Sequence, residues 1–162
     1  MSDDILKYPN PILTTPCEDF NFFNPPGDPK ELSLALMQFM NDHNAIGLSA
    51  NQLGIPYKVF VLRGHPENLV CFNPVVVSMS KETDLMDEAC ISYPGVNVKI
   101  KRAKEIRLRF TTPSGITETK SFNGLTARTI QHEMDHLSGI PFINRANRYH
   151  RDRAMKGYYN VK

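Results

Sequence analysis

A pair of histidines in the last third of the chain has the spacing of two metal ligands on one helix. The run His132-Glu133-Met134-Asp135-His136 places the second imidazole four residues after the first. Four residues turn an α-helix about 40° past one full turn, so both rings can reach one divalent metal ion. Glu133 would then lie beside the open coordination position and act as a base toward water. The pattern therefore predicts a hydrolytic metal centre.

Two histidines do not complete such a centre, and the residues that follow them offer few further donors. The position six residues after His136 is Phe142, where the metzincin arrangement needs a third His. No Glu follows Glu133, which excludes the downstream ligand of thermolysin-like enzymes. His150 and Asp152 lie in a basic segment where nothing suggests a metal shell. The third ligand is therefore expected upstream, and a cysteine is the strongest candidate because a thiolate binds such metals well.

The three cysteines lie in different sequence contexts. Cys17 belongs to a Pro-rich arm, Cys71 to an apolar run, and Cys90 to the short segment 87–95 between strand-like stretches. The apolar surroundings of Cys71 favour a buried structural thiol. Because three cysteines cannot all pair, the sequence argues against a disulfide framework and for a reducing compartment.

Periodicity and turn signals predict the elements that must position these residues. Residues 1–28 form an extended arm with turns, and Asp28 and Pro29 start a helix. Strands are expected over 57–62, 69–79, 106–112 and 116–122, and helices over 124–137 and 144–156. The sequence therefore predicts an α+β fold in which mostly antiparallel β-sheets pack around a central helix that carries H-E-x-x-H. We expect a single catalytic domain over 1–162, with a basic C-terminal segment at 144–162.

Composition and charge exclude several functions. The 162 residues carry a net charge of +2, too little for nucleic-acid binding by the whole domain, so DNA is not an expected partner. Residues 137–162 hold six basic residues and one acidic residue, so any contact with a polyanion such as ribosomal RNA should be sought only there, and a solvated helix face is the competing interpretation. No apolar run approaches the roughly 18 residues of a membrane helix. With no signal peptide evident, the sequence predicts a cytoplasmic protein without a membrane partner.

Three motifs, in this order along the chain, resemble those of the peptide deformylase family. Residues 45–52 (AIGLSANQ) are similar to G-[IL]-G-L-A-A-x-Q, residues 88–92 (EACIS) to E-G-C-L-S, and residues 131–137 (QHEMDHL) match Q-H-E-x-D-H-L without a departure. The departures are Ala45, Ser49, Ala89 and Ile91. Ala89 matters most, because its methyl group restricts the loop and crowds a substrate near the backbone. The resemblance implies a deformylase-like fold and removal of the N-formyl group from the formylmethionine of nascent polypeptides, giving formate and a free amino terminus.

The resemblance also implies the chemistry of the site. Cys90, His132 and His136 would hold one divalent ion in a tetrahedral centre with one water. Fe²⁺ would be the natural ion, and Zn²⁺, Ni²⁺ or Co²⁺ could substitute. Glu133 would take a proton from water and deliver it to the leaving amine. The side-chain amide of Gln52 and the backbone amide of Ile91 would donate hydrogen bonds to the developing oxyanion.

Formylmethionyl peptides, the implied partners, would bind as an added β-strand, with the methionine side chain in an apolar pocket. The implied substrate-binding residues are Ile46, Gly47, Leu48, Glu88, Ala89 and Leu125. Leu125 also falls on the helical stripe of His132 and His136, which supports its place in the pocket independently. Ordinary core packing is the competing interpretation for Ile46 and Leu125. Glu88 is expected to pair with Arg102 and brace the ligand loop, or to form an exposed ion pair of little consequence.

Two other functions compete with deformylation at this stage. H-E-x-x-H alone favours a zinc endopeptidase, which the missing downstream ligand disfavours. A binding protein whose metal only stabilises the fold would need four protein ligands, and no second cysteine lies near Cys90. An assay with a formyl-Met peptide beside a longer acetylated peptide separates the two hydrolases, because only a deformylase releases formate.

Overall fold

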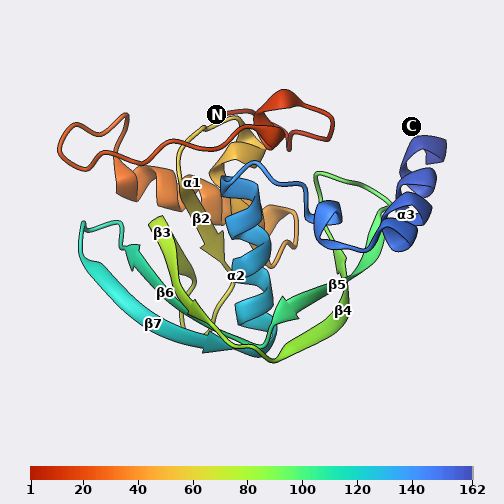
Figure 1. The fold of residues 1–162 in the computed structure, drawn as a ribbon. Helices are drawn as coiled ribbons and strands as arrows, with labels where there is room; N and C mark the ends of the chain where they lie inside the picture. The colour runs from red at the N-terminus through yellow and green to blue at the C-terminus, as the bar shows by residue number, and fades with distance from the viewer. Residues whose placement is uncertain (162) are drawn as a thin grey trace.

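Two antiparallel sheets lie on either side of a helix, α2, in the computed structural model, which describes residues 1–161 and their side chains as far as Tyr158 (Figure 1). The larger sheet has the order β1-β2-β3-β6-β7, and the smaller consists of β4 and β5. The predicted α+β class is confirmed. The strands are β1 Gly47–Ser49, β2 Val59–Leu62, β3 Leu69–Met79, β4 Thr83–Ala89, β5 Asn97–Ala103, β6 Glu105–Thr111 and β7 Thr117–Asn123. The helices are α1 Pro29–Asp42, α2 Gly124–Leu137 and α3 Arg148–Val161, with short 3-10 turns η1 Pro11–Thr14, η2 Ala50–Leu53 and η3 Phe142–Arg145.

The central helix α2 has two working faces. Its apolar residues recur at helical spacing and enter a core shared with β2, β3 and β6. These residues are Ala127, Ile130, Met134 and Leu137. The neighbouring stripe carries Leu125, Thr129, His132 and His136 toward the smaller sheet and β1. Packing of the first face therefore fixes the direction in which the second face presents its side chains.

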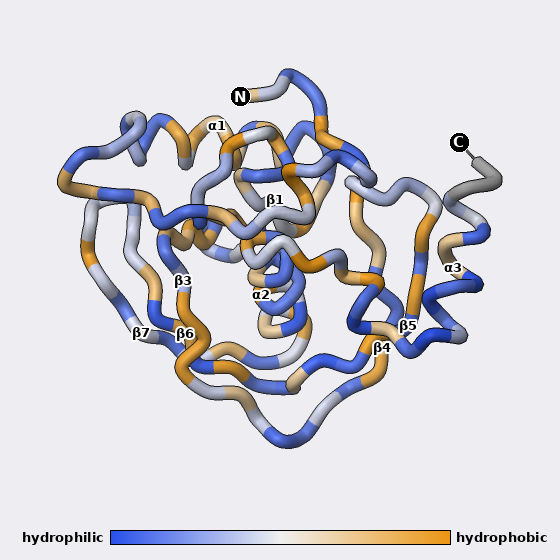
Figure 2. The backbone as a smooth tube through the Cα atoms, turned by 45° about the horizontal axis from the view of Figure 1, so that its top comes forward, coloured by the Kyte–Doolittle hydropathy of each residue, from blue (hydrophilic) through white to orange (hydrophobic). Residues whose placement is uncertain are grey.

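The other helices close the two ends of the molecule. α1 begins where Asp28 accepts a hydrogen bond from the backbone N–H of Lys30, as predicted, and packs against β1 and β2. α3 packs against β5, with Met155 and Tyr158 buried. Figure 2 shows that hydrophilic residues predominate along α3, whereas polar and apolar residues alternate along α2. No helix among residues 1–161 is long and apolar enough to cross a membrane.

Several elements differ from the sequence-based expectations. β4 and β5 were not expected as strands, yet they pair over seven residues and bring Glu88 and Ala89 to the end of β4, directly before Cys90. β4 is almost wholly solvent-exposed, so it lacks the alternation by which half-buried strands are found. The last helix begins at Arg148 instead of Asn144, because residues 142–145 form η3.

Candidate metal centre

Cys90, His132 and His136 converge at one point between α2 and the end of β4. One ligand atom from each residue lies within 4.8 Å of the other two, and Cys90 Sγ is 3.3 Å from His136 Nε2. Both rings are buried and Cys90 is partly buried. A thiolate and two imidazoles are ligands that Zn²⁺ and Fe²⁺ accept. Among the described residues, this group of three is the one arrangement of His, Cys, Asp and Glu that could hold a metal ion.

The ligand His132 is oriented by Glu88. Its Nδ1 lies 3.0 Å from Glu88 Oε1, so with Nδ1–H as the donor the ring leaves Nε2 for a metal. Burial lowers the pKa of His132, but hydrogen bonds with Cys90 and Glu88 outweigh it and raise this pKa to about 10. Burial lowers the pKa of His136, and the neighbouring His132 lowers it further. Because an imidazole must be neutral to bind a metal ion, metal binding displaces one proton from His132, which keeps its Nδ1–H.

Glu88 is held by two arginines in the protein interior. Arg102 binds its carboxylate in a bidentate manner at 2.8 and 2.9 Å, and Arg128 donates to Oε2 at 2.6 Å. All three side chains are less than a tenth exposed, so the alternative of an exposed Glu88–Arg102 pair is wrong. Burial acts to raise the pKa of Glu88, but the hydrogen bonds from Arg102 and His132 lower it to about 2. The carboxylate therefore remains ionised and fixes the ring of His132.

Sequence reasoning missed Arg128. Its guanidinium also donates to the backbone carbonyls of Ile100 and Asp84, so it ties α2 to both strands of the smaller sheet. The one available sequence signal for this role was the position of Arg128 between the apolar stripe and the functional stripe of a buried helix. Asp135 accepts hydrogen bonds from Arg102 and Arg145 and takes no part in the metal-ligand group.

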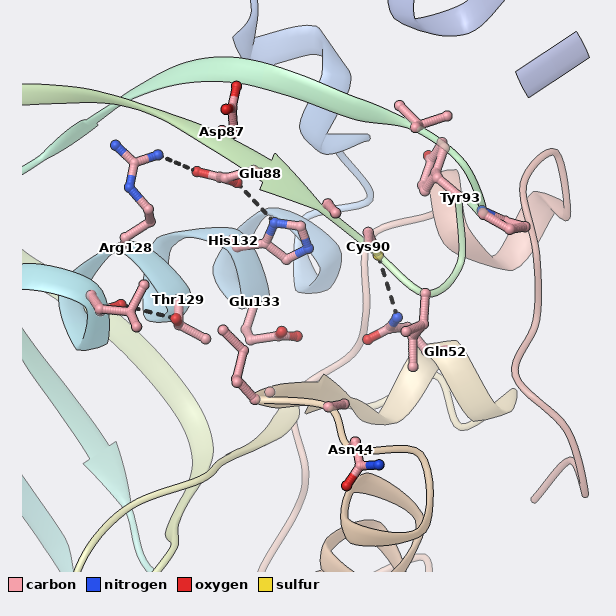
Figure 3. Close-up of a pocket in the computed structure, with 18 of the residues that line it drawn as sticks. Asn44, Gln52, Asp87, Glu88, Cys90, Tyr93, Arg128, Thr129, His132 and Glu133 are labelled. Carbon is pink, nitrogen blue, oxygen red and sulfur yellow. Dashed lines mark hydrogen bonds and ion pairs between the residues drawn. The ribbon is translucent and has the colours of Figure 1, made fainter. Parts of the chain in front are cut away.

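Glu133 lies on α2 beside the ligands, and its carboxylate is buried against Gly47 (Figure 3). Its Oε2 has no hydrogen-bond partner, which is rare for a buried carboxylate oxygen. Burial raises the pKa of Glu133 to about 7, although the charge of His132 and, less strongly, the nearby polar side chain of Ser49 oppose it. An unpartnered oxygen next to three converging ligand atoms fits a centre that takes a metal ion and a reacting water.

Gln52 approaches the three metal ligands from the side opposite Glu133. Its Nε2 lies 3.0 Å from Ser92 Oγ and 3.7 Å from Cys90 Sγ, and Figure 3 shows the amide pointing at the sulfur. Its Oε1 accepts a hydrogen bond from the backbone N–H of Ser49. Ile91 follows Cys90 on a turn, and its backbone N–H donates to no other described residue. Two N–H donors thus lie next to the ligand cysteine.

A cavity of about 560 Å³ opens onto this centre. The expected substrate-binding residues Ile46, Gly47, Glu88, Ala89 and Leu125 line it. The side chains of Ile46 and Leu125 are 53% and 60% exposed, so their interpretation as core residues is wrong. Leu48, expected among the substrate-binding residues, does not line the cavity. Its side chain is fully buried in the core beside α1. Strand alternation explains this, because Leu48 points away from the face that Gly47 presents.

The other two cysteines lie in the apolar core with β2, β3 and β6, away from the ligand group. Burial raises the pKa of Cys17 to about 11, and burial raises the pKa of Cys71 as well. Such thiols are poor ligands and poor nucleophiles because the thiolate form is scarce. Cys90 is therefore the cysteine that the fold offers to a metal.

Comparison with known proteins identifies the family. Residues 2–152 match the family described as polypeptide deformylase. The peptide deformylase of Aquifex aeolicus is 30% identical over 167 residues, which cover 99% of this chain and 97% of that protein. The structure of peptide deformylase from Plasmodium falciparum superposes with a TM-score of 0.89 at 27% identity, covering 98% of this chain and 94% of the other. The Acinetobacter baumannii deformylase, crystallised with Met-Ala-Ser bound, gives a TM-score of 0.83 at 27% identity, covering 90% of this chain and 98% of the other.

These matches span nearly the whole chain, and they agree with a Cys/His/His ligand group of the kind that deformylases use. They also decide against a zinc endopeptidase and against a binding protein whose metal only stabilises the fold. The chain therefore belongs to the polypeptide deformylase family, the metal-dependent hydrolases that remove the N-formyl group from nascent polypeptides.

Proposed function

We propose that Cys90, His132 and His136 hold the catalytic ion for deformylation, with Fe²⁺ as the natural ion and Zn²⁺, Ni²⁺ or Co²⁺ as substitutes. The observation that carries the proposal is the convergence of their ligand atoms within 4.8 Å at the mouth of an open cavity. When bound, such an ion polarises a carbonyl oxygen and lowers the pKa of water. Three protein ligands leave a coordination position free for this chemistry.

Glu133 is the proposed base. The water that attacks the formyl carbon must lose a proton, and the unpartnered Oε2 of Glu133 is placed to receive it. A pKa of about 7 suits a group that takes a proton at neutral pH and then delivers it to the leaving amine. Formate and a free amino terminus are the products.

Gln52 and Ile91 are the proposed oxyanion donors. One hydrogen of Gln52 Nε2 is engaged by Ser92 Oγ, and the other faces Cys90 Sγ across a long contact of 3.7 Å, which a substrate oxygen can replace. The free backbone N–H of Ile91 supplies a second donor. Loss of one oxyanion donor costs about 3 kcal/mol of transition-state stabilisation.

The proposed substrate is a peptide with an N-terminal formylmethionine. The exposed side chains of Ile46 and Leu125 give the cavity apolar walls for the methionine, and the backbone of Gly47 and Ala89 flanks the path of the peptide. The Met-Ala-Ser bound by the Acinetobacter baumannii deformylase has the form of such a product. We also propose that the basic helix α3 contacts ribosomal RNA. The enzyme would then act in the cytosol, where chains are synthesised.

Formate release from a formyl-Met peptide tests the activity, with a longer acetylated peptide as the control for endopeptidase cleavage. Glu133→Gln should keep one bound metal ion per chain and abolish formate release. Wild-type turnover in this variant would refute the assignment of Glu133 as the base. Cys90→Ser should weaken metal binding. An unchanged metal content under mild chelation would point to another ligand.

A further inference from the structure

We propose that Ser49 and Asn51 form a positioning pair that aligns both the side chain of Gln52 and the end of α2 that carries His136. The inference rests on the roles proposed above for Gln52 and His136. It adds Ser49 and Asn51, which have no role in the proposed function. Both side chains of the pair are completely buried, and they lie between the turn η2 and the last turn of α2.

The hydrogen bonds of the pair can be oriented atom by atom. Asn51 Nδ2 donates to the backbone carbonyl of His136 at 2.7 Å, so Asn51 Oδ1 faces the other way. That oxygen lies 2.8 Å from Ser49 Oγ, which also lies 3.1 Å from Gln52 Oε1. Gln52 Oε1 already accepts the backbone N–H of Ser49 at 3.0 Å. The single hydroxyl proton of Ser49 therefore goes to Asn51 Oδ1, the nearer oxygen, which has no other donor.

The same contacts determine which way Gln52 points. Its oxygen is held at the backbone of Ser49, so its NH₂ group must face Ser92 and Cys90. A turned amide would place its oxygen against the sulfur and its NH₂ against the N–H of Ser49. The donor proposed for the oxyanion is thus set before substrate arrives, which is the condition for electrostatic stabilisation without reorganisation.

The other end of the pair acts on the metal ligand. The last carbonyls of a helix have no partner within the helix, and the carbonyl of His136 receives Asn51 Nδ2 together with the backbone N–H of Gly139. A direct hydrogen bond thus links the turn that carries Gln52 to the residue that carries a ligand ring.

Ser49→Ala removes only the hydroxyl and leaves Asn51 Oδ1 buried without a donor. We expect Asn51 to turn away from His136, so that Co²⁺ binds roughly tenfold more weakly, as is usual when a residue supporting a metal ligand is lost. The absorption spectrum of bound Co²⁺ should also shift, because it reports the geometry of the ligands. In formate release, kcat should fall roughly tenfold while KM stays within about twofold, because the apolar pocket is unchanged.

Ser33→Ala is the matched control. Ser33 is a buried serine of α1 whose hydroxyl donates to the carbonyl of Pro29, and α1 contributes no residue to the ligand group or to the lining of the cavity. It should lower the melting temperature comparably and leave Co²⁺ affinity, Co²⁺ spectrum and kcat unchanged. Should Ser49→Ala behave as Ser33→Ala does in all three measurements, the proposed pair is overturned.

Asn51→Ala and the double variant provide the second measurement. If the two residues act as a unit, Ser49→Ala should add no further loss of Co²⁺ affinity or kcat in the Asn51→Ala background. A further loss in the double variant would refute the pair. This comparison uses only Asn51→Ala and the double variant, so it does not require that Ser49→Ala alone folds. Gln52→Leu separates the inference from the proposed function. Full turnover in Gln52→Leu would remove the oxyanion role, whereas the Co²⁺ measurements on the pair do not depend on it.

Discussion

Gly47 allows Glu133 to occupy its position, and adding a single methyl group at residue 47 should slow catalysis without removing the metal. A Cβ atom at residue 47 would lie 2.8 Å from Glu133 Oε1, 2.9 Å from a Leu62 methyl carbon and 3.0 Å from the Thr129 methyl carbon. Leu62 and Thr129 are also too close to the added methyl group and must give way by a few tenths of an ångström. Glu133 is only 3% exposed, so its carboxylate must shift among packed neighbours or toward the cavity.

The size of the effect follows from the shift required. An ordinary contact with a Cβ atom begins at 3.4 Å, so the carboxylate oxygen at 2.8 Å must retreat by about 0.6 Å. Misplacement of a catalytic group by about 1 Å costs on the order of a hundredfold in rate. We therefore expect Gly47→Ala to lower kcat for formate release by roughly tenfold to a hundredfold.

Formate release at saturating formyl-Met peptide measures this loss, and metal analysis of the same sample should still find one ion per chain. Gly27→Ala is the control, because a Cβ atom at residue 27 meets no atom within 4 Å. A Gly47→Ala enzyme with wild-type kcat would refute the placement of the Glu133 carboxylate against this strand. Loss of the metal ion would show that the methyl group acts on the ligands instead.

Three further predictions follow from the buried charges. In the metal-free protein, the raised pKa of about 7 at Glu133 lowers the free energy of unfolding as the pH rises from about 4.5 to 7. Glu133→Gln removes this loss, so its stability gain over wild type in urea unfolding should be about 3 kcal/mol larger at pH 8 than at pH 4. A pH-independent difference would contradict this. The lowered pKa of Glu88 has the opposite effect on stability. As the pH falls from about 4.5 to 2, the wild-type protein should lose about 3 kcal/mol of its free energy of unfolding, and Glu88→Gln should not. Unfolding measured across this acid range tests the difference. Arg128→Met should cost about 3 kcal/mol of stability in thermal or urea unfolding, because it leaves the carbonyls of Asp84 and Ile100 without their buried donor; an exposed position such as Arg148 should tolerate the same change without measurable loss.

Features of the chain that depend on local pattern were predictable. The residues 124–137 were expected as a helix and form α2 with those bounds, because apolar and functional residues recur with the helical period in separate stripes. The residues 69–79 were likewise expected as a strand and form β3. The spacing of His132 and His136 predicted a shared metal ion, and the three motifs resembled one enzyme family. These signals lie within short segments, so no knowledge of the packing was needed.

Features that depend on pairing between distant segments required the tertiary structure. The register of β4 against β5 carries Cys90 to the two imidazoles. β5 alternates exposed and buried residues, but β4 is almost wholly exposed, so local pattern does not reveal that the two strands pair. The four hydrogen bonds on Glu88 come from one strand, β5, and from α2, up to 44 residues away. Sequence alone determined which residue types could do the chemistry. The family resemblance singled out Cys90, but residue types alone left three cysteines open. Only the packed fold shows that Cys90 meets the histidines, because the distance between side chains of remote segments depends on how those segments pack.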